Sequence, residues 1–158
     1  MSEPVADCIL CEGSVADERL GVVEIWQDAL WRVTMSYTSE TPGFSYLEPK
    51  RHITDITRLD GPEAESLGPT LARVTAALRD ETKAERVYIY VFGDGVAHLH
   101  LHLAPHQPGD ALNSQIIRGE VVERQLPSGV TIIESKDFPP LPEAGLRGLA
   151  ERVRLRLA

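Results

Sequence analysis

The chain is short of several residue types. It has two cysteines in 158 residues, 6% aromatic residues, and 16 basic against 24 acidic residues, for a net charge of −8. Two cysteines cannot build a disulfide framework, and since no secretory signal begins the chain, we expect a reducing cytoplasm. No apolar run approaches the roughly 20 residues of a membrane span, so we expect no membrane partner. The acidic balance argues against a general nucleic-acid binder.

The 42% of hydrophobic residues that are present suffice for the core of one domain, and their alternation with polar residues predicts strands. We expect a hairpin first, then a third strand that ends before Pro49, because proline cannot continue ladder pairing. Two more strands are expected on either side of a glycine turn, and two β-like runs follow Pro105. The expected strands are residues 20–26, 30–35, 44–47, 86–92, 98–103, 116–124 and 130–134.

Two helices are expected beside these strands. The first has Asp60 as its N-cap and runs to about Thr82, and Pro69 is expected to kink it or to separate its first turn. The second covers residues 143–157, with an apolar stripe for the core and arginines on a solvated outer face. The order of strands, long helix, strands and closing helix predicts an antiparallel α+β domain.

Three histidines alternate with leucines in one short segment. If this segment is a strand, His98, His100 and His102 share one face while the leucines bury the other. Three imidazoles packed without partners would leave ring nitrogens unpaired, which disfavours a purely structural role. The row can supply a nucleophile with hydrogen-bond donors for a phosphate, or it can hold a catalytic metal ion. Spacing alone does not choose between these two chemistries.

A pair of cysteines near the start of the chain has the spacing of a metal knuckle. Cys8 and Cys11 are separated by two residues, as in zinc sites and redox motifs. A redox role calls for a helix N-terminus after a strand, and the surrounding sequence does not predict one. A metal site and two unrelated, merely small and apolar thiols remain as alternatives.

The histidine segment resembles a known family signature. His98-Leu99-His100-Leu101-His102-Leu103 is similar to the motif of the histidine-triad (HIT) superfamily, of the zinc-bearing bacterial type. Pro49-Lys50-Arg51-His52 resembles the segment that precedes the long helix in that family. The resemblance covers residues 8–106. It implies a HIT-like antiparallel sheet with one long helix and a C-terminal helix, a HIT-like core at residues 1–106, and residues 107–158 as an extension packed on the same domain.

The resemblance also implies an activity and a partner. Proteins of this kind are nucleotide hydrolases or transferases that cleave at the α-phosphate of a nucleotide ester, anhydride or phosphoramidate. On this chain His100 would be the nucleophile that forms a phosphohistidine intermediate, and His102 would contact the phosphate. His98 would orient the neighbouring ring or ligate metal. A small nucleotide would be the ligand, and a homodimer the expected assembly.

The zinc-bearing members suggest how the cysteine pair is used. In those members the site is completed by the histidine after the proline-lysine segment and by the first histidine of the triad. On this chain the ligand set would be Cys8, Cys11, His52 and His98. A closed Cys₂His₂ set is structural, and it would fix the N-terminal segment to the active strand.

The loop before the triad departs from the family pattern. Members commonly carry a longer loop with an asparagine and a glycine-glutamine pair, whereas this chain has Gly93-Asp94-Gly95. We expect the two glycine amides to face the phosphate, with Asp94 adding negative charge, and His106 to replace part of the charge of a family arginine. These departures support an alternative function, a nucleotide-binding or regulatory module that keeps the fold without turnover.

Overall fold

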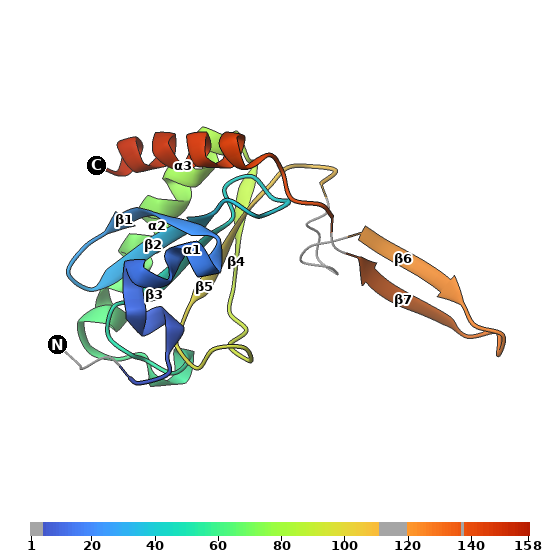
Figure 1. Ribbon diagram of the computed structural model, residues 1–158, viewed down its shortest axis with the longest axis horizontal. Helices are drawn as coiled ribbons and strands as arrows, with labels where there is room; N and C mark the ends of the chain where they lie inside the picture. The colour runs from blue at the N-terminus through green and yellow to red at the C-terminus, as the bar shows by residue number, and fades with distance from the viewer. Residues whose placement is uncertain (1–4, 111–119, 137) are drawn as a thin grey trace.

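The computed structural model describes residues 5–110, 120–136 and 138–158, and its centre is an antiparallel sheet of five strands (Figure 1). The strands follow the order β1-β2-β3-β5-β4 across the sheet, so that β1 and β4 form its edges. Their bounds are β1 Val22–Gln27, β2 Trp31–Ser36, β3 Ser45–Pro49, β4 Arg86–Tyr90 and β5 Leu101–His106.

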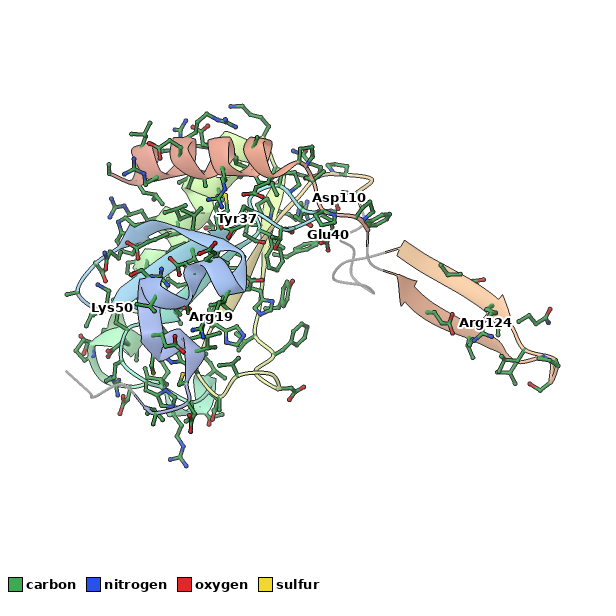
Figure 2. The ribbon with its side chains drawn as sticks, in the orientation of Figure 1. Arg19, Tyr37, Glu40, Lys50, Asp110 and Arg124 are labelled. Carbon is green, nitrogen blue, oxygen red and sulfur yellow. The ribbon has the colours of Figure 1, made fainter. Side chains whose placement is uncertain are left out.

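Helices and a separate hairpin complete the described chain. The N-terminal turns η1 and α1 lie in front of the sheet in Figure 1, whereas α2 and α3 cover its other face. The hairpin β6-β7 lies apart from the sheet, and Arg124 pairs with Glu134 across it (Figure 2). The bounds are η1 Ile9–Ala16, α1 Asp17–Leu20, η2 Ile56–Arg58, α2 Gly61–Thr82, β6 Glu120–Gln125, β7 Thr131–Lys136 and α3 Glu143–Leu157.

The core lies between the sheet and the two long helices. Alternate strand residues such as Val33, Leu47 and Leu103 have no exposed surface, and they pack with Val74 of α2 and Val153 of α3. Each apolar side chain of this size that is removed from water contributes about 1.5–3 kcal/mol to folding. The opposite face of the sheet is thereby left for polar side chains.

Most expected strands are present, but the histidine strand is displaced. The first hairpin is confirmed, but the prediction that the third strand ends before Pro49 is wrong, because β3 includes Pro49, which pairs with Trp31 of β2. The prediction of a strand over residues 98–103 is wrong, because β5 begins at Leu101 and continues to His106. The backbone N–H of Leu99 donates instead to the carbonyl of Ile53 (2.7 Å), outside the ladder. Residues 91–100 therefore form a long connection, not a tight turn between two strands.

Helix α2 begins where expected and is not divided. Asp60 is its N-cap residue, but the Asp60 side chain accepts a hydrogen bond from Arg51 (2.7 Å) and not from the helix. Of the two effects expected of Pro69, separation of the first turn is wrong, since α2 continues through it, and a kink stays a prediction. Proline removes one helical hydrogen bond, and burial of Val74 and Leu78 against the sheet offsets that loss.

The closing helix matches its predicted range and its predicted buried stripe. Leu146, Leu149, Val153 and Leu157 are all buried, and α3 packs on α2 and β1. The outer face carries exposed ion pairs such as Arg154 with Glu151, as expected for a solvated surface. The start of the predicted run 116–124 lies outside the described residues. Among the helices of the described chain, none combines the length and apolar character needed to cross a membrane.

Candidate functional site

The face of the sheet opposite α2 and α3 carries a continuous patch of polar and aromatic side chains. Strand register places Arg32 of β2 opposite Glu48 of β3, and Tyr46 of β3 opposite His102 of β5. Because neighbouring residues along a strand point to opposite faces, the buried Leu47 and Leu101 between them point into the core. The same alternation that builds the core thus builds the site.

His100 lines a cavity on this face and has a defined tautomer. The cavity measures about 150 Å³ and is lined by His100 together with residues of η1, α1, β1, β2 and β3. Nδ1 of His100 lies 2.7 Å from the carbonyl oxygen of His98. A carbonyl can only accept, so Nδ1 carries a proton, and in the neutral ring Nε2 then carries the lone pair. This arrangement suits a nucleophile or a general base.

His102 lies beside this ring, within an aromatic cluster. The rings of His100 and His102 are stacked with their centroids 5.3 Å apart. Tyr46 meets His102 edge-on at 5.2 Å, and Tyr90 lies tilted against it at 4.7 Å. Such contacts restrict the ring. The structure therefore brings two of the three triad histidines together, and both are half-buried.

The third triad histidine belongs to a different cluster. One ligand atom from each of four residues lies within 4.8 Å of the others, and the residues are Cys8, Cys11, His52 and His98. Nδ1 of His98 is 3.4 Å from Sγ of Cys8, and Nδ1 of His52 is 3.3 Å from Sγ of Cys11. Tetrahedral zinc with ordinary bond lengths separates a sulfur and a nitrogen ligand by about 3.6 Å. The spacing and the donor atoms both fit zinc.

The orientation of His98 supports the same conclusion. Its ring is 1% exposed, and Nε2 donates to the carbonyl of Pro49 (2.9 Å), which leaves the lone pair of Nδ1 facing the cysteines. Burial lowers the pKa of His98 and raises the pKa of the Cys11 thiol. His98 and His100 both precede the paired strand, and the His98 ring meets the ring of His52 at 5.1 Å, whereas the rings of His100 and His102 stack on each other. Among the described residues, the group that could hold a metal ion contains His98 but neither His100 nor His102.

The segment before α2 holds His52 in position. Arg51 donates from Nε and Nη2 to the carboxylate of Glu63 at 3.1 and 3.0 Å. These bonds lower the pKa of Glu63 and anchor the segment to the first turn of α2. On the other side, Nζ of Lys50 donates to the carbonyl of Asp28. His52 is thereby fixed between a helix and a strand connection.

The residues expected to bind substrate lie in two places. Asp94 and Gly95 are exposed, Gly93 has a φ of 104° that only glycine adopts easily, and Val96 is the residue of this loop that lines the cavity. His106 lies further along β5 than His102. Its ring stacks on Tyr88 at 4.7 Å, and Nδ1 donates to Asp110 (2.6 Å). Figure 2 places Asp110 toward the end of the sheet from which the hairpin departs. Phosphate contacts by these residues remain predictions.

Two residues of the cavity were not singled out by the sequence pattern. Arg32 and Glu48 both line it, and both side chains are almost fully buried, at 7% and 4% exposure. The sequence does carry one signal for Arg32. It lies between Trp31 and Val33, so the alternation of the strand places its side chain on the face opposite these two apolar residues. A charged residue in such a strand is commonly solvated, and only the tertiary structure shows that this one is enclosed.

The chain matches one protein family. A family model described as HIT domain matches residues 23–109. An uncharacterized HIT-like protein of Mycobacterium tuberculosis, found in two strains, is 28% identical over 126 residues, which cover 74% of this chain and 82% of that protein. With the site described above, this match means that the chain belongs to the HIT domain family.

Solved structures share the fold. A hypothetical histidine triad nucleotide-binding protein from Sulfolobus tokodaii strain7 aligns with a TM-score of 0.65 at 17% identity, covering 95% of this chain and 91% of that one. A zinc-bound histidine triad family protein from Mycobacterium smegmatis aligns with a TM-score of 0.63 at 20% identity, covering 96% and 95%. At these identities the likeness concerns the α+β fold.

Proposed function

We propose that the chain is a nucleotide hydrolase or transferase that cleaves at the α-phosphate of a nucleotide ester, anhydride or phosphoramidate. The observation that carries this proposal is the hydrogen bond from Nδ1 of His100 to the His98 carbonyl. Because this bond places the proton on Nδ1, the neutral ring keeps its lone pair on Nε2, the atom that would attack phosphorus. His100 lines the cavity in which a small ligand would lie. Membership of the HIT family supports the reaction class.

The reaction takes two displacements. Nε2 of His100 forms a bond to the α-phosphorus while the bond to the leaving group breaks, and the leaving group departs with the bonding electrons. Water then attacks the same phosphorus, the phosphorus–nitrogen bond breaks, and the nucleoside monophosphate and a proton are released. His102, stacked on His100, would donate a hydrogen bond to a phosphate oxygen.

The four-residue cluster would hold a structural zinc ion. The Cys₂His₂ set is closed, which leaves no ligand position for substrate, and the fold relative from Mycobacterium smegmatis is zinc-bound. Bound zinc would fix the N-terminal segment to residue 98. Ligand thiolates need reducing conditions, which supports a cytoplasmic location.

Replacement of the nucleophile tests the proposal. A dinucleoside polyphosphate or a nucleoside phosphoramidate should yield the nucleoside monophosphate, and His100→Ala should reduce turnover by at least about 1,000-fold. Intact-mass spectrometry of the quenched wild-type protein should show one nucleotidyl group, which His100→Ala lacks. Thermal melting provides the folding control. Full turnover by folded His100→Ala would refute the assignment.

A nucleotide-binding or regulatory module is the second candidate. The exposed loop with Asp94, which places a negative charge between two glycines, favours it. Tight nucleotide binding without product or covalent intermediate, over a broad panel of nucleotide esters, anhydrides and phosphoramidates, would support this candidate over the hydrolase.

We also propose a homodimer. Strand β4 forms an edge of the five-stranded sheet (Figure 1), and Ile89 on this strand is 46% exposed. An exposed edge with an apolar side chain is suited to pairing with a second copy of itself.

A further inference from the structure

The cavity beside His100 has two kinds of wall. Side chains such as Leu20, Val22 and Val96 form apolar walls, as a flat ring system requires. The charged side chains of Arg32 and Glu48 line the same cavity. A ligand that fills it must therefore satisfy buried charged groups as well as apolar ones.

Arg32 is held by neighbouring carboxylates. Its Nη2 donates to both oxygens of Asp17 at 2.7 and 2.5 Å, and its Nε donates to Glu24 at 2.6 Å. These bonds keep the pKa of Arg32 above its ordinary value. The guanidinium is fixed, so it does not turn toward an incoming ligand. What remains of its donor capacity faces Glu48.

Glu48 has acceptor capacity that the protein does not use. Among the described residues, its carboxylate has one hydrogen bond, a long one of 3.4 Å from Nη1 of Arg32. Burial outweighs Arg32 and raises the pKa of Glu48 to about 7. The carboxylate lines the cavity, so its remaining acceptor positions are within reach of donors on a ligand. The site thus favours a ligand that brings hydrogen-bond donors.

We propose that Glu48 is a specificity-determining residue that selects a guanine base, with Arg32 as the group that fixes the carboxylate in place. Guanine presents two adjacent donors, N1–H and the 2-amino group, which match the two oxygens of a carboxylate. Adenine presents one donor beside a lone pair at N1, and that lone pair would face an anion. This inference rests on the proposed function, because it takes the cavity beside His100 as the nucleotide site.

Calorimetric titration with three monophosphates tests the selection. At pH 8.5, where Glu48 is ionised, the full-length wild-type protein should bind GMP about 10- to 100-fold more tightly than AMP, with IMP between them because it lacks the 2-amino group. Equal affinities, tighter binding of AMP, or no binding of any of the three would overturn the inference. This ranking needs no variant, so it holds as a test even if a substitution fails to fold.

Two amide substitutions distinguish the role of Glu48, which lines the cavity, from that of Glu24, which pairs with the same Arg32. Glu48→Gln offers one donor and one acceptor, so the preference for GMP over AMP should fall at least about 10-fold. Glu24→Gln removes a charge from the same Arg32 but does not change the lining of this cavity, so the ranking should stay as in wild type. An unchanged ranking in folded Glu48→Gln contradicts the assignment.

The inference and the proposed function fail in different ways. A GMP preference without any covalent intermediate on His100 would refute the hydrolase while leaving the selection by Glu48 intact. Turnover of guanine and adenine substrates at equal kcat/KM, with equal binding of GMP and AMP, would refute the selection while leaving the hydrolase intact.

Discussion

At the scale of single residues, the least expected feature is the enclosed carboxyl group of Glu48. Its side chain is 4% exposed and its pKa is raised to about 7, because the cost of burial exceeds the attraction of Arg32. Asp17 and Glu24, which share the same guanidinium, add repulsion. The protonated form of Glu48 is consequently favoured by folding.

This shift predicts a pH dependence of stability. The raised pKa of Glu48 means that its contribution is complete below its ordinary value of 4.5 and is lost as pH rises through about 7. Between pH 5 and pH 8, the wild-type free energy of unfolding should fall by up to about 3 kcal/mol more than that of Glu48→Gln. Urea denaturation of both proteins in the presence of zinc measures the difference. Parallel pH profiles would contradict the shifted pKa.

At the scale of elements, short segments from three parts of the chain converge at the cysteine-histidine cluster. The turn η1 supplies Cys11, the segment before α2 supplies His52, and the connection before β5 supplies His98. None of these segments is a strand or a long helix. A metal ion that links them stabilises the folded chain, because the unfolded chain does not hold the ligands together.

Metal removal should therefore loosen these segments together. The wild-type protein should contain one zinc per chain, and Cys11→Ser should lose it. A chelator should lower the Tm of wild type by about 5 to 10 °C, as expected for loss of a ligand present well above its Kd. The chelator should leave the Tm of Cys11→Ser unchanged, which is the matched control. Full zinc content in Cys11→Ser would place the metal elsewhere.

The elements differ in how well the sequence predicts them. The buried stripe of α3 was predictable because helical periodicity is local, and Leu149 and Val153 follow it. The start of β5 was not, since residues that alternate in burial need not be paired: Leu99 is buried, yet its N–H bonds to Ile53. The continuity of α2 through Pro69 was not predictable either, because packing of the helix on the sheet is not visible locally.

The candidate site likewise has residues that the sequence predicts and residues that it does not. The grouping of Cys8, Cys11 and His52 with His98 followed from the family resemblance, and the structure brings all four together. The enclosure of Arg32 was not predictable, because it depends on carboxylates contributed by other elements. Local alternation placed its side chain on a face, but only the fold shows what covers that face.

At the scale of the whole molecule, β4 is one of the two edge strands at which the described five-stranded sheet can be extended. A dimer through this edge should have twice the chain mass of 17.4 kDa in light scattering. Ile89→Lys adds a charge to the edge and should shift the protein toward monomer. Val122→Lys, on the separate hairpin, adds the same charge and should leave the mass unchanged. A monomeric wild-type protein would exclude the homodimer.

One bond within the site has a consequence for how the protein tolerates mutation. The group that sets the tautomer of His100 is the main-chain carbonyl of residue 98. Every amino acid has that carbonyl, so no substitution at position 98 deletes it. A side-chain carboxylate in the same role could be lost by a single codon change. The His100 ring is thus protected against loss of its orienting acceptor, and substitutions of His98 affect this bond only through displacement of the backbone.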